Sequence, residues 1–198
     1  MSNIICFDTE TTGIDPRVGD EMLSLAIIDG DGNELFNKRF RPTNKKNLEF
    51  GWPEAEKINH ISLKDVITLP TFEHYRDEVQ KIFDDADEIV GFNTAFDIKM
   101  VKAGKIKLPD MDYAQALTKC DRKHGKPLVV HDVMRMYSDT FGGKWPKLVA
   151  LAEKYRYNWQ GDAHDALFDT KATLYCFEKL QEEIKNANSV LRGTQLHF

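Results

Sequence analysis

Acidic side chains in three distant segments constrain the fold of this chain more than any other feature of its sequence. Asp8 and Glu10 lie near the N-terminus, Asp97 lies near the middle, and Asp169 follows His164 after another long interval. Carboxylates gathered in one place repel each other strongly. A fold that brings them together therefore needs cations, and hard oxygen ligands favour Mg2+ or Mn2+.

The bulk properties of the chain fit one ordinary globular domain. Its 198 residues are 41% hydrophobic and 30% charged, which is typical of globular proteins, and a chain of this length buries roughly 70% of its unfolded surface. The formal net charge of -5 argues against broad binding to duplex nucleic acid, which depends on many lysine and arginine contacts to phosphates. The net charge does not argue against a pocket that binds the end of one strand, because divalent ions would offset the carboxylates locally.

The cysteines and the N-terminal segment indicate the compartment. Cys6, Cys120 and Cys176 are far apart and show no Cys-x-x-Cys spacing, which suggests free thiols in a reducing compartment. The N-terminal segment has no basic region, and its apolar run is too short for a signal peptide or a membrane span. We therefore expect a cytoplasmic protein with no membrane contact.

Hydrophobic periodicity predicts an opening set of strands followed by alternating helices and strands. The expected strands cover residues 3–8, 22–29, 34–41 and 88–92, with a possible strand at 128–130. The expected helices cover residues 53–59, 72–84, 94–103, 112–121, 133–140, 145–155 and 166–184. A turn signal at 29–33 indicates an antiparallel meander, and the order of elements indicates a layered α/β fold with a mixed central sheet.

Spacing within the first and third acidic segments predicts how their side chains are placed. Asp8 and Glu10 share one face of a strand, since side chains alternate along it. His164 and Asp169 are separated by about 140° around a regular helix, so they would not converge if both lay within one. The helix should therefore begin at or just after His164, which leaves the imidazole on a mobile segment and fixes Asp169 on the helix.

The three segments together resemble the motifs of DEDDh, or DnaQ-like, 3′-to-5′ exonucleases, a family that includes polymerase proofreading subunits. Residues 8–13 are similar to its Asp-x-Glu-Thr-Thr-Gly motif, residues 93–97 to Asn-x-x-Phe-Asp, and residues 164–172 to His-x-Ala-x-x-Asp-x-x-Ala. A sister branch has tyrosine at position 165, where this chain has aspartate, and histidine occupies position 164. The resemblance is therefore to the histidine branch.

The resemblance implies an α/β, ribonuclease H-like three-layer fold with a mixed central β-sheet flanked by helices. It also implies release of nucleoside 5′-monophosphates from 3′ ends by two Mg2+ or Mn2+ ions, roughly 4 Å apart. Asp8, Glu10, Asp97 and Asp169 would hold the ions. His164 would be the general base that deprotonates the attacking water, a role that suits imidazole near neutral pH.

Further residues within or beside the motifs are predicted to contact the substrate: Thr11, Thr12, Gly13, Ile61, Asn93 and Phe96. Gly13 would let the backbone come close to the terminal nucleotide. Phe96 fits a stacking role and a core position equally well. Ile61 would wedge near the end base, although Asn59 stands where the family commonly has histidine, which leaves contacts there open.

Each motif taken alone has an ordinary explanation. Asp8 and Glu10 could be a solvated strand end, Asp97 could complement a helix dipole, and His164 could be a surface histidine. All three in family order favour the metal site. Asp162 and Asp165 compete to cap the last predicted helix and are left out of the ligand set.

Two segments outside the motifs have roles that stay open. Residues 110–126 look like an insertion, and the basic residues between 99 and 126 could guide a single strand or could simply be solvated. The tail from Gln195 to Phe198 resembles short peptides that bind sliding clamps, and it could equally fold back on the domain. We expect an exonuclease domain over residues 1–184 and a C-terminal tail over residues 185–198.

The leading prediction is a metal-dependent 3′-to-5′ exonuclease that acts on single-stranded DNA 3′ ends in proofreading or repair, with a polymerase or sliding clamp as the suggested partner. One alternative is a 3′-to-5′ exoribonuclease that trims RNA ends, because the 2′-hydroxyl is read by details of the pocket. Another is a non-catalytic nucleic-acid-binding or scaffold subunit that keeps the fold.

Overall fold

A mixed β-sheet forms the centre of the computed structural model, which describes residues 2–121, 127–161 and 164–194. Within those residues the sheet has six strands in the order β3-β2-β1-β4-β6-β5. They are β1 (Ile4–Thr11), β2 (Met22–Asp29), β3 (Glu34–Arg39), β4 (Glu88–Gly91), β5 (Leu117–Cys120) and β6 (Leu128–Asp132). Strands β1, β2 and β3 form an antiparallel meander, β4 and β6 run parallel to β1, and β5 runs antiparallel to β6.

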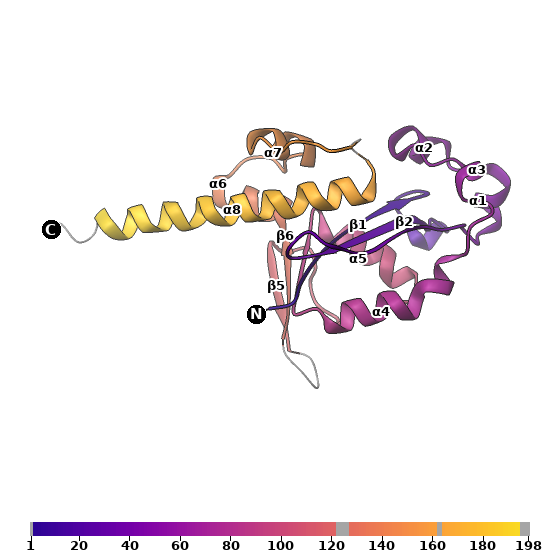
Figure 1. Ribbon diagram of the computed structural model, residues 1–198, viewed down its shortest axis with the longest axis horizontal. Coiled ribbons are helices and arrows are strands. Elements are labelled where there is room, and N and C mark those ends of the chain that lie inside the picture. The colour runs from indigo at the N-terminus through magenta and orange to yellow at the C-terminus, as the bar shows by residue number, and fades with distance from the viewer. Residues whose placement is uncertain (1, 122–126, 162–163, 195–198) are drawn as a thin grey trace.

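Helices cover both faces of this sheet (Figure 1). On one face lie α6 (Val133–Phe141), α7 (Leu148–Lys154) and the long α8 (Ala166–Thr194). On the other lie the 3-10 turn η2 (Phe72–Tyr75), α4 (Arg76–Asp85) and α5 (Thr94–Ala103). A 3-10 turn η1 (Pro16–Val18) follows β1, while α1 (Lys45–Phe50), α2 (Pro53–Asn59) and α3 (Leu63–Val66) follow β3. The expected arrangement of a mixed sheet between helices is confirmed.

The alternation of side chains along β1 divides the core into two parts. Ile5 and Phe7 face α4 and α5, where the ring of Phe7 meets that of Phe83 edge to face with centroids 5.1 Å apart. Cys6 faces α8 and packs in the second core cluster with Phe177. Because strand side chains alternate, the carboxylates two and four positions after Cys6 point to the α8 face.

The helix predicted over 112–121 is wrong. Residues 117–120 instead form the edge strand β5, in which Leu117 pairs with His131 and Cys120 pairs with Leu128. The backbone of β6 would otherwise be an open edge, and pairing with β5 satisfies it. A four-residue strand carries too little periodicity to be separated from a helix by sequence alone.

Other element boundaries follow the sequence closely, with differences at the ends. The helix predicted over 145–155 begins only at Leu148, because Pro146 and the extended residue Lys147 precede it. The helix predicted over 166–184 begins at Ala166 as expected and continues to Thr194. In Figure 1 its last turns project beyond the sheet. Residues 195–198, with the predicted clamp-binding tail, lie outside the described residues.

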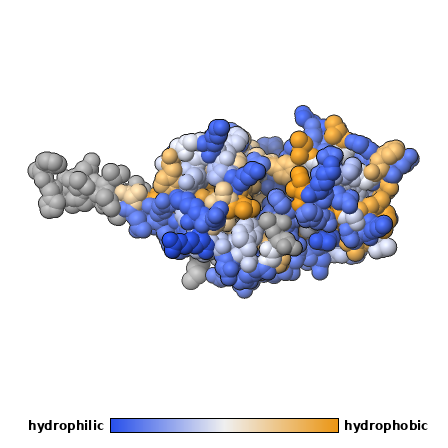
Figure 2. Space-filling model, turned by 90° about the horizontal axis from the view of Figure 1, so that it is seen from above, coloured by the Kyte–Doolittle hydropathy of each residue, from blue (hydrophilic) through white to orange (hydrophobic). Residues whose placement is uncertain are grey.

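The surface is largely hydrophilic on the face seen from above (Figure 2), with hydrophobic residues in patches. Phe50 and Ile58 are among the exposed hydrophobic residues, with 70% and 56% of their surface exposed. Among the described residues, none of the helices is both long and apolar enough to cross a membrane.

Candidate active site

Three carboxylates meet where β1 ends and α8 begins. One oxygen from each of Asp8, Glu10 and Asp169 lies within 4.8 Å of the others. Asp8 and Glu10 reach this point because they share one face of β1, and Asp169 reaches it because the first turn of α8 packs on that face. The sequence predicted that these three residues would meet, and their oxygen donors suit a hard divalent cation.

Asp97 approaches β1 from α5, on the face of the sheet opposite α8. The parallel pairing of β1 with β4 reaches only as far as Cys6 and Val90. Farther along β1, the carboxylate of Asp97 accepts hydrogen bonds from the backbone N–H of Thr9 at 3.0 Å and from its hydroxyl at 2.6 Å. Asp97 is 3% exposed, so α5 holds it firmly beside the three-carboxylate cluster rather than within it.

Asp132 is a buried carboxylate that the sequence analysis did not single out. It is fully buried at the end of β6 and accepts hydrogen bonds from the backbone N–H groups of Asn93 at 3.2 Å and Thr94 at 3.0 Å. Asn93 has a left-handed backbone with φ of 60°. Asp132 therefore fixes the first residues of α5, and through them the position of Asp97. Its place two residues after a predicted strand was the available signal.

Burial and mutual repulsion shift the acidic groups toward their protonated forms. The pKa of Asp8 is raised well above its ordinary value, first by desolvation and then by the charges of Asp97 and Glu10. Burial, followed by the charge of Asp169, raises the pKa of Glu10 to about 9. Burial raises the pKa of Asp97 to about 7, although the hydrogen bonds from Thr9 oppose the shift. A bound cation would strongly stabilise the ionised form of these carboxylates.

The segment before α8 carries the predicted base. His164 is exposed and has a left-handed backbone with φ of 70°, and its N–H donates to Asp169 at 3.3 Å. Burial raises the pKa of Asp169, and that N–H together with the His164 charge lowers it in part. The side chain of Asp165 accepts from the N–H of Leu167 at 3.1 Å and thus caps the helix. The competing cap, Asp162, lies outside the described residues.

Arg39 supplies positive charge beside the cluster. In the sheet register Glu10 pairs with Ser24, and Ser24 pairs with Arg39, so the three side chains share one face. The guanidinium lies 3.7 Å from the Asp165 carboxylate, and its charge lowers the pKa of Glu10 slightly against the larger upward effects. Arg39 was not predicted from the sequence, since only the register of the folded sheet brings it near the acidic residues.

The residues that follow Glu10 shape a tight loop. The hydroxyl of Thr11 donates to the carbonyl of Gly13 at 2.7 Å, and the hydroxyl of Thr12 accepts from the N–H of Glu21 at 2.9 Å. A Cβ at Gly13 would collide with the Asp20 carboxylate. The structure thus uses these side chains within the loop, and their contacts to substrate stay predictions.

Other predicted substrate contacts lie deeper in the fold. Ile61 is 2% exposed and packs in a small core with Leu23 and Trp52, so contact with a base would require it to leave that core. Asn59, which replaces the common histidine, donates to the carbonyl of Thr11 at 3.0 Å. Phe96 is partly buried against the core, with the Lys99 ammonium 5.4 Å from its ring centroid.

Comparisons with known proteins agree on one kind of domain. Residues 5–177 match the family model RNase_T, described as exonuclease. Exonuclease CP81 of Escherichia phage 186 is 26% identical over 177 residues, which cover 89% of this chain and 87% of that protein. DNA polymerase III subunit epsilon of Rickettsia felis is 26% identical over 175 residues, which cover 83% of this chain and 68% of that protein.

A solved structure supports the fold. Exonuclease X in complex with 5′ overhanging duplex DNA matches with a TM-score of 0.62 at 20% identity, covering 91% of this chain and 92% of that one. At this level of identity the likeness concerns the fold alone. It confirms the ribonuclease H-like three-layer arrangement expected from the sequence.

Proposed function

This chain belongs to the RNase_T exonuclease family, and from that premise we propose that it releases nucleoside 5′-monophosphates from DNA 3′ ends with two divalent metal ions. The family depends on divalent metals. The observation that carries the proposal is the meeting of Asp8, Glu10 and Asp169 within 4.8 Å, with Asp97 beside them. The described residues thus offer a set of oxygen donors that suits Mg2+ or Mn2+.

Each residue of the site has a proposed role that follows from its place. Asp8, Glu10, Asp97 and Asp169 hold the ions, which when bound polarise the phosphodiester and lower the pKa of water. His164, on its exposed segment, takes the proton from the attacking water, since imidazole exchanges protons readily near neutral pH. The rigid carboxylates orient the reacting groups, while the histidine has the freedom to approach and leave.

Supporting residues keep the ligands in place. Asp132 anchors the start of α5, and Thr9 donates two hydrogen bonds to Asp97. Partners of this kind orient metal ligands and tune their affinity. The loop held by Thr12 and Glu21 brings the backbone at Gly13 next to the end of β1, where a terminal nucleotide would lie.

The name of one relative favours DNA as the substrate and a polymerase as partner. That relative is a subunit of DNA polymerase III. We therefore propose action on single-stranded DNA 3′ ends in proofreading or repair, with trimming of RNA ends as the second candidate because the same metal site serves both sugars. A clamp contact through Gln195 to Phe198 stays a prediction.

Domain extent and location complete the proposal. We propose that residues 1–184 form the exonuclease domain and residues 185–198 a tail, so a chain ending at Ile184 should keep the activity. The free thiols of Cys6 and Cys176 are buried, and that of Cys120 is partly exposed. Such thiols fit a reducing compartment, and we propose a cytoplasmic location.

A degradation assay tests the activity, its direction and its substrate. Single-stranded DNA and RNA of one sequence, labelled at either the 5′ or the 3′ end, are incubated with Mg2+, with Mn2+ or with chelator. We expect a shrinking ladder from the 5′-labelled DNA, immediate release of a labelled mononucleotide from the 3′-labelled DNA, and no reaction in chelator. Intact DNA under all conditions would refute the proposal, and faster loss of RNA would favour the second candidate.

A further inference from the structure

The segment that joins α6 to α7 displays a large aromatic side chain. It runs over residues 142–147 with the sequence Gly-Gly-Lys-Trp-Pro-Lys, and we call it the tryptophan segment. Trp145 is 59% exposed, which is unusual for so large an apolar side chain. Gly142 and Gly143 have φ of 75° and 98°, and a Cβ at either would meet no atom within 4 Å. The backbone there takes a conformation that favours glycine and leaves open space around it.

A chain of contacts ties this segment to the end of the sheet that carries the acidic site. The ring of Trp145 lies over the guanidinium of Arg135, 4.4 Å from ring centroid to Cζ. Arg135 lies in the first turn of α6, 3.4 Å from the Asp132 carboxylate. Asp132 in turn binds the first backbone N–H groups of α5, the helix that carries Asp97. Trp145 therefore lies on the active-site side of the molecule.

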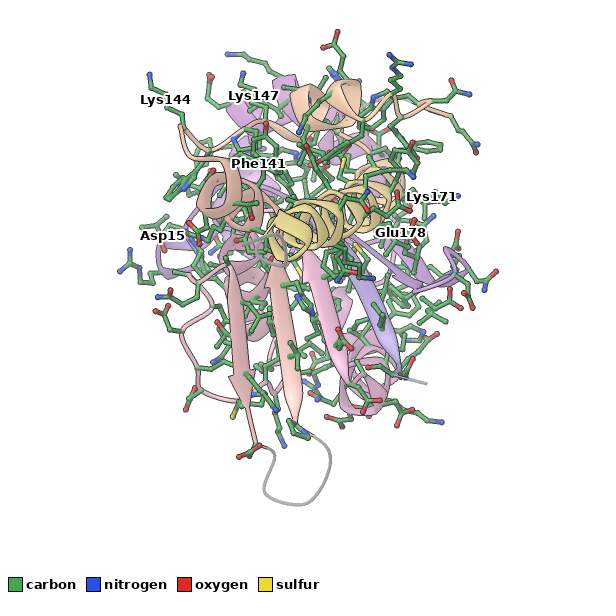
Figure 3. The ribbon with its side chains drawn as sticks, turned by 90° about the vertical axis from the view of Figure 1, so that its left-hand side faces the viewer. Asp15, Phe141, Lys144, Lys147, Lys171 and Glu178 are labelled. Carbon is green, nitrogen blue, oxygen red and sulfur yellow. The ribbon has the colours of Figure 1, made fainter. Side chains whose placement is uncertain are left out.

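The view along the sheet agrees with this placement. In Figure 3 Lys144 and Lys147 lie above the strands, near the upper edge of the molecule, and Asp15, in the loop that follows β1, lies toward the same end of the strands. Both lysines are exposed. Two positive charges thus flank the exposed ring.

An exposed indole with flanking ammonium groups has the chemistry to hold a single strand. Aromatic rings stack on bases without regard to sequence, and lysines on either side contact the phosphates. Arg135 beneath the ring holds it in place through a cation–π contact. Phe50 offers a contrast, since this 70% exposed aromatic follows the acidic Glu49. The tryptophan segment therefore differs from Phe50 in the positive charge that flanks its exposed ring.

We propose that the tryptophan segment is a second nucleotide subsite, where Trp145 stacks on a base of single-stranded nucleic acid upstream of the 3′-terminal nucleotide while Lys144 and Lys147 contact the flanking phosphates. The inference rests on the proposed exonuclease function, because it places the strand relative to that site. The simplest competing role for Trp145 is a lid that shields Arg135. A lid needs only apolar volume, whereas a subsite needs a flat π face.

Binding without catalysis tests the subsite directly. A 5′-fluorescein-labelled dT12 is titrated in chelator and followed by anisotropy, with thermal melts to verify that each variant is folded. Stacking of one base is worth enough that Trp145→Ala should weaken binding roughly fivefold to a hundredfold. Trp145→Phe should keep most of the affinity, and Trp145→Leu should behave like Trp145→Ala. If Trp145→Leu binds as tightly as Trp145→Phe, the lid explanation holds and the subsite is refuted.

A charge-matched pair of variants tests the lysines. Lys147→Gln should weaken dT12 binding and make it less dependent on salt, because one phosphate contact is lost. Lys81→Gln removes the same charge from an exposed position of α4, on the opposite face of the sheet, and should leave binding unchanged. Equal effects of the two variants would show a general charge effect and would overturn the phosphate contact.

Kinetics separate this inference from the proposed function. With Mg2+, Trp145→Ala should raise KM for dT12 by a similar factor and lower kcat far less, because the segment holds the strand and does not touch the reacting phosphodiester. An unchanged KM for dT12 in every Trp145 variant, with normal degradation, would refute the subsite and spare the exonuclease. If Trp145→Ala weakens dT12 binding while the unchanged protein degrades no substrate, the exonuclease function is refuted and the subsite is supported.

Discussion

The two ends of the proposed site are held in very different ways. Asp8 and Glu10 lie in a central strand, and Asp97 is fixed by two hydrogen bonds from Thr9. His164 is exposed, has a left-handed backbone, and is held to Asp169 through its backbone N–H. The residues proposed to bind metal thus lie in regular strands and helices, while the residue proposed to move a proton lies on an exposed segment before α8.

The strongest test of the proposed metal ligands is Asp8→Asn. This change removes a ligand charge while keeping the side chain's shape, and several kcal/mol of transition-state stabilisation should be lost with the metal, about 10³-fold or more in rate. The measurement is the initial rate on labelled DNA with Mg2+. Asp31→Asn, at an exposed position in the turn after β2, is the matched control and should keep the full rate. Equal activity of the two variants would contradict the metal assignment.

The proposed general base is tested by His164→Asn. Asparagine tolerates a left-handed backbone better than most residues, so this variant removes the imidazole with little added strain at φ of 70°. Loss of a general base costs about 10²- to 10⁴-fold. Calorimetric titration with Mn2+ should show unchanged affinity, because the carboxylates remain. A full rate would show that another group takes the proton.

A smaller effect is expected from Thr9→Val, which sharpens the comparison by loosening Asp97 alone. The variant loses the hydroxyl bond of 2.6 Å and keeps the backbone bond of 3.0 Å. Groups that orient metal ligands are worth about 10- to 100-fold in metal affinity or activity. The apparent Mg2+ affinity should fall accordingly. Thr140→Val, which removes a hydroxyl bond within α6, should not change it.

The smallest expected effect is on stability as a function of pH. The pKa of Glu10 rises from its ordinary 4.5 to about 9 on folding. The folded, metal-free protein therefore binds more protons than the unfolded chain between these values, and its stability should fall as pH rises from 5 to 9. The thermal midpoint in chelator should drop across this range, because each kcal/mol of lost stability lowers it by roughly 2–4 °C.

Two changes should flatten that pH dependence. Saturating Mg2+ would neutralise the carboxylate charges in place of the bound protons. Glu10→Gln removes the titrating group itself. A thermal midpoint that rises between pH 5 and pH 9 in chelator would contradict the direction of the shift.

Much of the site was predictable because its residues lie in short motifs with regular periodicity. The alternation of Asp8 and Glu10 on one strand face, and the start of α8 beyond His164, both follow from the residue spacing. The same is true of the α/β class, since β2 and α2 have the boundaries that the pattern predicts.

What could not be predicted depends on contacts between distant segments. Arg39 is near the carboxylates only through the register of three strands, and the role of Asp132 depends on where β6 ends relative to α5. The strand β5 exists because β6 offers it an edge. Such features are fixed by tertiary pairing, which overrides local preference.

The order in which the proposed ligands occur along the chain has a consequence for synthesis. Asp169 belongs to α8, the last helix that the structure describes, while Asp8 lies in the first strand. During translation a ribosome-bound chain would hold an incomplete set of the proposed ligands until α8 has left the exit tunnel and docked on β1. The proposed assignment therefore implies that the nascent polypeptide stays inactive toward nucleic acid until nearly all of its described length has been made.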